Sequence, residues 1–309
     1  MVGRERPPPR ADKVRPVTGV WRGPAADRRT YDRPVRPGSG CLVRVSGALA
    51  LVALLVGAYV GYQALRSPGQ PAGPACRATA GGVSYGFDAE QGANATTVAA
   101  VGKRLGLADH AVTVALAAAL QESKLHNLAH GDLDSLGLFQ QRPSQGWGTP
   151  AQVMTPRYAA AAFFRRLAQV PDWQTLSVTD AAQAVQRSAA PGAYAQWDPQ
   201  ARVLAQALTG EVAAAFACRA AVAAPRPTQD PFSAARSAAM TAEIGAADVG
   251  PSVSVPRGWL IASWLIGHAR QYGVASVTFG GQRWTADRGA WVVQPPEVAT
   301  GTDRVQINT

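Results

Sequence analysis

The stretch from Gln121 to Gln141 decides how this chain is interpreted. It reads Gln121-Glu122-Ser123 and, further on, Gly131-Asp132-Leu133-Asp134-Ser135-Leu136-Gly137-Leu138-Phe139-Gln140-Gln141. An apolar run of helical pattern precedes it, marked by Val112, Val114, Leu116 and Leu120. We therefore expect Glu122 at the end of an apolar helix, beside a loop rich in Gly and Gln. A carboxyl group partly withdrawn from water has a raised pKa, which suits a general acid.

These residues resemble the catalytic domain of bacterial lytic transglycosylases, which has a lysozyme-like fold. In that family a Glu-Ser pair closes a helix and a Gly-Leu-(Met/Phe)-Gln segment follows it. Here Gly137 comes 15 residues after Glu122, and the string DLDSLGLFQQRPSQGWGT, residues 132–149, is similar to that of anchored bacterial lysozyme-like proteins. The resemblance implies a helical lysozyme-like domain over residues 76–218 that cleaves MurNAc–GlcNAc β-1,4 bonds of peptidoglycan.

The resemblance also implies roles for individual residues. Glu122 would be the catalytic acid and then the base, and Ser123 would support it by hydrogen bonding. The sugar cleft would be lined by Gly137, Leu138, Phe139 and Gln140. Lytic transglycosylases need only one glutamate and no cofactor, because the N-acetyl group and the 6-hydroxyl of the substrate do the rest. The product is a 1,6-anhydro-muramyl end, an exception to the usual pair of carboxylates.

One segment departs from the family pattern. Typical soluble transglycosylases carry Ala-Tyr-Asn-Ala-Gly downstream, where Tyr and Asn place the substrate. The nearest counterpart here is Ala184-Val185-Gln186-Arg187-Ser188-Ala189. Gln186 or Ser188 would have to substitute for Tyr-Asn, so Gln186 joins the expected substrate-binding residues. The alternative is a non-catalytic scaffold or pseudoenzyme that binds murein without cutting it.

Other interpretations of the same residues stay open. Asp132 and Asp134 are candidates for the second carboxylate of a hydrolase. Together with His126 and His130 they would also be the ligands of an envelope metal-handling protein. Gly131 makes a continuous helix through these residues doubtful, so no metal site is assigned. Glu122 itself would otherwise be a surface carboxylate paired with a nearby cation.

Four of the aromatic residues that follow the Gln121–Gln141 stretch are candidates for sugar binding. Each would be either a surface on which a sugar ring stacks or part of the hydrophobic core, and single aromatic residues are more often core. These residues are Trp147, Tyr158, Tyr194 and Trp197.

Residues 44–66 are predicted to form a single transmembrane helix. Residues 45–65 hold no charged side chain, and about 20 apolar residues suffice to cross a hydrocarbon core of roughly 30 Å. A signal peptide would have a shorter apolar region nearer the N-terminus. Membrane lipid is thus one expected partner of the chain.

The charge distribution predicts the orientation. Residues 1–44 carry eleven Lys/Arg against four Asp/Glu, which is +7 of the net charge of +10. Basic residues stay on the cytoplasmic side, so the N-terminus would be cytoplasmic and the remainder extracytoplasmic, in a bacterial cell membrane. The basic, Pro-rich tail of residues 1–43 is expected to be disordered, and no nucleic-acid partner is inferred from its charge.

Two of the three cysteines bracket the central domain. Cys76 and Cys218 would both lie in an oxidising compartment, where disulfides persist, and we expect them to be joined. Within this domain Thr155-Pro156 is expected to begin a helix, as N-cap and first helical residue, and Asp198-Pro199 to begin another.

The C-terminal segment is predicted to be a separate small α/β domain over residues 229–309, after a linker of residues 219–228. It contains expected strands at VASVTFGG and RVQINT. The segment resembles the zinc D,D-peptidase-like domain of cell-wall hydrolases, in which the last strand carries two histidines. Arg304 and Gln306 stand at those positions, which implies a non-catalytic module because arginine does not ligate zinc.

The expected fold class is therefore mainly α. The order is a cytoplasmic tail (1–43), a single transmembrane helix (44–66), a linker (67–75), the α-helical lysozyme-like domain (76–218), and the small C-terminal α/β domain.

Overall fold

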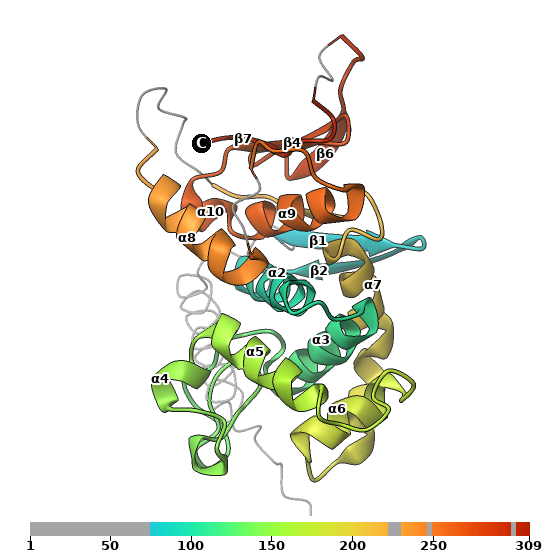
Figure 1. Cartoon of the computed structure of the whole chain (residues 1–309), viewed down its shortest axis with the longest axis vertical. Helices are drawn as coiled ribbons and strands as arrows, with labels where there is room; N and C mark the ends of the chain where they lie inside the picture. Colours follow the sequence, from blue (N-terminus) through green and yellow to red (C-terminus); the bar gives the residue numbers. More distant parts are fainter. Residues whose placement is uncertain (1–74, 222–229, 246–248, 298–300) are drawn as a thin grey trace, which may run out of the picture. The chain divides into compact units, whose positions relative to one another are not determined.

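The computed structural model describes residues 75–221, 230–245, 249–297 and 301–309, all of which belong to one compact unit (Figure 1). Two adjacent helices form its centre, α2 (Ala89–Arg104) and α3 (Asp109–Ser123). Most of their residues are small and buried, eleven of the fifteen in α3. A helix that is apolar on all sides has to be enclosed by other elements, so these helices hold the core.

The remaining helices pack around this centre. The first group follows α3 in the sequence and is joined by irregular loops: η1 (Pro143–Gln145), α4 (Pro150–Val153), α5 (Pro156–Leu167), α6 (Val178–Gln186), η2 (Pro191–Trp197) and α7 (Asp198–Leu208). Of these, α6, η2 and α7 pack against α3, and α5 packs mainly against α2. Thr155 is the N-cap of α5 and Pro156 its first residue, as expected. The second group comes from the C-terminal segment: α8 (Ser233–Ile244), α9 (Val255–Gly267) and α10 (Ala269–Tyr272).

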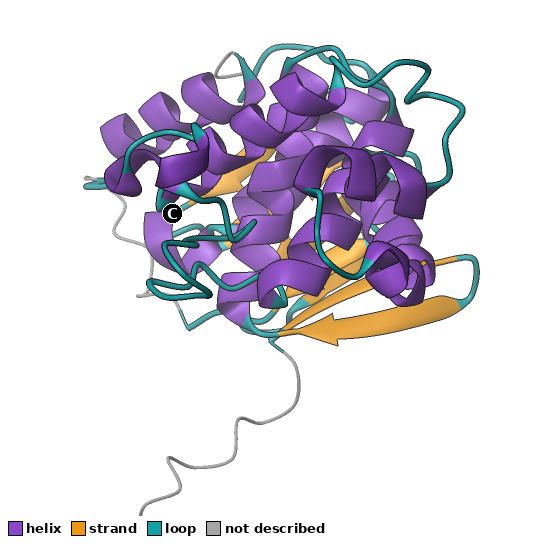
Figure 2. Cartoon of the chain, turned by 90° about the horizontal axis from the view of Figure 1, so that it is seen from below, coloured by secondary structure: helices purple, strands orange, loops and turns teal. Residues whose placement is uncertain are grey.

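Two antiparallel sheets complete the unit. The first has the order β2-β1-β3, from β1 (Cys76–Ala80), β2 (Val83–Phe87) and β3 (Phe216–Cys218). The second has the order β6-β5-β4-β7, from β4 (Ser276–Phe279), β5 (Gln282–Thr285), β6 (Ala290–Val293) and β7 (Gln306–Asn308). Figure 2 shows that helices make up most of the unit and that the β1–β2 hairpin extends from its edge.

The expected fold class, mainly α with a single transmembrane helix, is wrong. About 48% of the described residues are helical and about 15% are in strands, which form the two sheets. Both ends of the region expected to be all-helical pair as strands, with Cys76 opposite Cys218. Among the residues that the structure describes, no helix is long and apolar enough to cross a bilayer. The predicted span, residues 44–66, lies outside the described residues.

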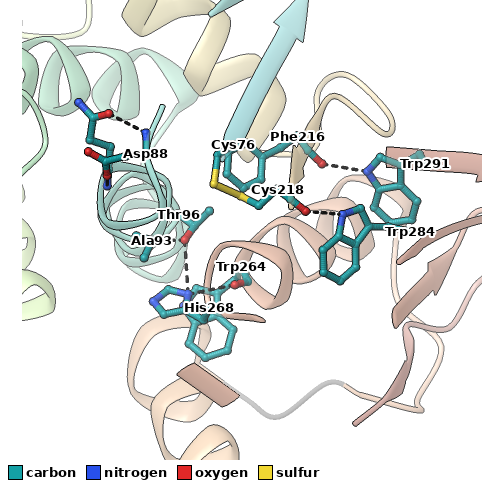
Figure 3. The surroundings of a disulfide bond; sticks show 11 residues. Cys76, Asp88, Ala93, Thr96, Phe216, Cys218, Trp264, His268, Trp284 and Trp291 are labelled. Carbon is teal, nitrogen blue, oxygen red and sulfur yellow. Dashed lines mark hydrogen bonds between the residues drawn. A yellow bond between two sulfur atoms is a disulfide. The ribbon is translucent and has the colours of Figure 1, made fainter. Parts of the chain in front are cut away.

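The predicted disulfide between Cys76 and Cys218 is present (Figure 3). It closes a loop with a sequence separation of 142 residues, and native disulfides typically contribute about 2–5 kcal/mol to the free energy of unfolding. The carbonyl oxygens around it accept bonds from the C-terminal sheet. The indole N–H of Trp284 donates to Cys218 O (3.0 Å), and that of Trp291 donates to Phe216 O (2.9 Å).

The C-terminal segment shares its core with the rest of the unit. Helix α9 packs against α2, α7, β3 and β4, and Trp264 of α9 is fully buried. Gly258 of α9 faces the ring of Phe279 so closely that a Cβ there would lie 1.8 Å from it. Residues 222–229, most of the expected linker, lie outside the described residues. In space the two expected domains are parts of one packed body.

Candidate active site

Glu122 lies in the last turn of α3, as the sequence predicts. The helix ends at Lys124, whose left-handed backbone (φ 55°) turns the chain, and Leu125 is left-handed as well (φ 66°). Two consecutive left-handed residues are unusual away from glycine. They direct the chain from α3 into the irregular segment that carries the Gly-Leu-Phe-Gln residues. The Glu122 side chain remains partly buried at this junction.

Tyr194 is the direct partner of Glu122. Its hydroxyl donates a hydrogen bond of 2.7 Å to Glu122 Oε1. Tyr194 lies in η2, 72 residues further along the chain, and its ring is fully buried. Burial raises the pKa of the Tyr194 phenol, so this group keeps its proton and remains a donor.

The pKa of Glu122 is raised, chiefly because burial disfavours its charged form. Hydrogen bonds from Tyr194 and Gln186 and the charge of Lys124 act in the opposite direction and offset part of this effect. Glu122 is thus a carboxyl group that holds its proton to higher pH than an exposed glutamate.

Ser123 points into the protein. It is buried, and its hydroxyl donates to Leu138 O (2.7 Å) and more weakly to Ala119 O (3.2 Å). Leu138 and Phe139 are also fully buried, and Phe139 stacks on Phe163. These three residues hold the loop against the end of α3. The structure therefore places them behind the site, where they position the residues that face solvent.

Gln140 and Gln186 face the open side. Gln140 has a left-handed backbone (φ 46°), and its amide lies so close to Gly131 that a Cβ there would be 1.8 Å from Gln140 Oε1. Gln186 ends α6, and its amide nitrogen donates to Phe139 O (2.9 Å). Gly137 is left-handed (φ 76°), and a Cβ there would lie 2.3 Å from Val153 O. Only glycine fits at Gly137, so its role is to shape the loop.

A groove of about 700 Å³ joins these groups. Glu122 lines it together with Gln121, Gln140 and Gln186, and its walls come from α3, the loop after it, α5 and α6. Several polar side chains converge in this groove on a carboxyl group of raised pKa, which makes it the candidate ligand-binding site. The predicted residues Glu122, Gln140 and Gln186 are thus brought to one groove.

The two aspartates considered as second carboxylates differ in their surroundings. Asp134 is engaged by Arg142 Nε (2.8 Å) and by both the backbone N–H and the hydroxyl of Ser144. These bonds hold the pKa of Asp134 well below its usual range. Asp132 lines the groove with Glu122, so it is the aspartate of the two that faces a ligand there.

The residues considered as metal ligands do not form a cluster. His126 Nε2 bonds Asp88 Oδ2 (2.8 Å), the N-cap of α2, while Asp134 pairs with Arg142. In the parts of the chain that the structure covers, no three His, Cys, Asp or Glu side chains are arranged to hold a metal ion. The described residues of the C-terminal sheet likewise contain no such group: Gln306 lies in β7 and Arg304 lies beside Asp303.

Sequence reasoning missed the roles of two aromatic residues. Tyr194 was expected to be core, and it is, yet its hydroxyl also contacts the predicted acid. The indole N–H of Trp197 donates to Gln121 Oε1 (2.8 Å), and the Lys124 ammonium lies over the indole ring, 4.1 Å from its centroid. The family pattern directed attention to a tyrosine near Gln186. Tyr194 comes eight residues later, in the segment Ala193-Tyr194-Ala195-Gln196, which shares Ala-Tyr with that pattern but has no asparagine after the tyrosine.

Comparison with known proteins adds no family to this geometry: no protein-family model matches the chain, and no curated protein matches it.

Proposed function

We propose that this protein cleaves the MurNAc–GlcNAc β-1,4 bonds of peptidoglycan with Glu122 as its single catalytic carboxyl group. The observation that carries the proposal is the partly buried Glu122 carboxyl group, which has a raised pKa, accepts a hydrogen bond from Tyr194 and lines a polar groove. The disulfide supports an oxidising, extracytoplasmic compartment.

The first step is protonation of the leaving oxygen. Because Tyr194 donates to Oε1, the acid proton of Glu122 is carried on Oε2. That proton passes to the glycosidic oxygen as the bond from this oxygen to C1 of MurNAc breaks, which leaves Glu122 ionised. The tyrosine hydroxyl then stabilises the carboxylate, since it donates to the charged form.

In the second step Glu122 acts as the base. It removes the proton from the 6-hydroxyl of the same MurNAc, whose oxygen closes on C1 to give the 1,6-anhydro sugar. Glu122 regains its proton and no water is consumed. Gln140 and Gln186, whose side chains line the groove, supply amide oxygens as acceptors for the acetamido N–H and hydroxyl groups of the glycan.

The test is digestion of purified sacculi by the full chain, comparing wild type with Glu122→Gln by mass spectrometry. We expect anhydro-muropeptides from wild type alone. Products with reducing ends would instead indicate hydrolysis, with Asp132 as second carboxylate. Sacculus binding without any product would contradict cleavage and make the protein a murein-binding scaffold.

A further inference from the structure

The groove is electrostatically asymmetric. Five charged side chains line it: Glu122, Asp132, Arg142, Arg166 and Arg187. Of the three arginines, Arg142 is neutralised by Asp134. Neither Arg166 nor Arg187 has a carboxylate partner among the described residues. The wall built by α5 and α6 therefore presents two guanidinium groups that lack counter-charges within the described unit.

Arg166 is held in position by uncharged groups. Its guanidinium lies over the indole ring of Trp147, 3.5 Å from the ring centroid. One terminal nitrogen donates to Gln145 O (3.1 Å) and Gly146 O (3.2 Å). Stacking of this kind fixes the plane of a guanidinium and leaves its other N–H groups able to bind a ligand.

Arg187 approaches Arg166 from the neighbouring helix. It follows the last residue of α6 in a left-handed conformation (φ 53°), and its backbone N–H donates to Gln183 O (2.8 Å). Both side chains line the same groove, and the charge of Arg187 lowers the pKa of Arg166, second to the effect of burial. Two positive charges that line one groove repel each other, and the attraction of a bound anion to both would offset that repulsion.

We propose that Arg166 and Arg187 form a binding subsite for a carboxylate carried by the glycan strand. This inference rests on the proposed function, because the acidic groups of peptidoglycan are carboxylates, and guanidinium groups bind them with planar, two-point geometry. The carboxylate has two sources. One is the lactyl group of a muramyl residue without its peptide, and the other is the stem peptide. The preferred substrate is in either case an acidic muramyl glycan, and a neutral GlcNAc polymer is a poor one.

The test measures ligand binding by calorimetry, with the full chain carrying Glu122→Gln so that no ligand is consumed. Three oligosaccharides of equal length are compared: a neutral GlcNAc polymer, a GlcNAc–MurNAc strand with free lactyl carboxylates, and the same strand bearing stem peptides. We expect at least one acidic strand to bind about tenfold more tightly than the neutral one, the size of one charge-assisted pair. The strand that shows the preference identifies the source of the carboxylate.

Three further substitutions locate the effect. Arg187→Asn removes the charge and keeps a residue that tolerates the left-handed conformation, and Arg166→Gln removes the second charge. Each should reduce the tenfold preference to about twofold or less, while binding of the neutral polymer stays unchanged. Arg165→Gln is the matched control, since Arg165 lies next in sequence, is exposed, and is not part of the groove lining. It should keep the preference.

The preference should also weaken between about 0.05 and 0.5 M salt in wild type, because partly exposed charges are screened over roughly a Debye length. Equal affinities for neutral and acidic strands, or an unchanged preference in both arginine variants, would overturn the subsite and leave the proposed function standing. Failure of all three ligands to bind would overturn both. Digestion of sacculi by wild type shows whether the subsite alone fails, in which case cleavage persists, or whether the proposed function fails with it.

Discussion

Two partly buried glutamates of this protein accept similar hydrogen bonds from side chains, but their surroundings differ. Glu122 accepts a bond of 2.7 Å from Tyr194, and Glu243 of α8 accepts bonds of 2.8 Å from Thr97 and from the indole of Trp264. The donors of Glu243 belong to α2 and α9, so that carboxylate joins the C-terminal segment to the central helix. Glu122 instead lies beside a groove of about 700 Å³. Hydrogen bonding alone does not mark a candidate catalytic carboxyl group. What distinguishes Glu122 from Glu243 is the groove beside Glu122.

The surroundings of Glu243 are those of a structural junction. His268 stacks on Trp264 with ring centroids 4.3 Å apart, and the hydroxyl of Thr96 lies beside its imidazole (Figure 3). The hydroxyl of Thr97 lies 3.4 Å from Nε2 of the same ring. Burial lowers the pKa of His268, partly offset by the charge of Glu243 and the bond to Trp264 O. The polar groups here satisfy one another, whereas at the groove beside Glu122 two arginines have no carboxylate partner among the described residues.

The largest expected effect is a difference in activity between variants of the two glutamates. Glu122→Gln should lower the rate of sacculus cleavage by at least about 100-fold, because general acid catalysis contributes on that order. Glu243→Gln keeps an oxygen that can accept both bonds and lies away from the groove, so its rate should match wild type. The measurement is release of soluble muropeptides over time. Equal losses in both variants would mean that Glu122 is another structural glutamate.

The second effect concerns stability, and here we expect the Glu243 variant to show the loss. Glu243→Ala leaves the hydroxyl of Thr97 and the indole N–H of Trp264 without their acceptor. An unsatisfied buried donor costs about 1–3 kcal/mol, so we expect the free energy of unfolding to fall by about 2–4 kcal/mol. Urea denaturation followed by circular dichroism measures it, with the exposed Glu297→Ala as control. A loss no larger than the control would show that Glu243 does not join the two segments.

A smaller effect is expected when Tyr194 is changed to Phe. Loss of the hydroxyl removes a bond that lowers the pKa of Glu122, so that pKa rises further. Activity should fall by about tenfold at the optimum, consistent with one lost hydrogen bond to a charged group. The alkaline limb of the pH–rate profile should move to higher pH. Tyr85→Phe, in β2 and outside the groove lining, is the control. An alkaline limb that stays in place would contradict the pairing.

The smallest effect is a pH-dependent gain in stability. The folded-state pKa of Glu122 is raised, so the folded protein binds this proton more tightly than the unfolded chain. Stability is therefore lost as pH rises from the unfolded pKa through the folded one. Glu122→Gln cannot ionise, and its melting temperature should exceed that of wild type by a few degrees at pH 8 and match it at pH 4. Thermal melts at both pH values decide it; a difference independent of pH would contradict the raised pKa.

Part of the site was predictable because it depends on local sequence. The apolar run before Glu122 predicts a helix that ends near it, and the following glycines allow the turns that bring Gln140 to the same place. The partner of Glu122 was not predictable, because Tyr194 is 72 residues away. Leu138 and Phe139, which were expected to line the cleft, are buried in the core, and the hydroxyl of Ser123, which was expected to support Glu122, donates to Leu138 O and Ala119 O.

The sequence by itself determined the features that short-range chemistry controls. Thr155 and Pro156 begin α5, Asp198 begins α7, and the alternating residues near 276–279 and 306–308 form strands. The pairing of Cys76 with Cys218 also followed, because they are the two cysteines that bracket the domain.

The tertiary structure alone decided the rest. It brings β1 beside β3, sets α9 against α2, and places Arg166 and Arg187 on one wall of the groove. These contacts join residues far apart in the chain. They are fixed by how the apolar faces of whole helices and sheets pack together, and no local pattern encodes that result.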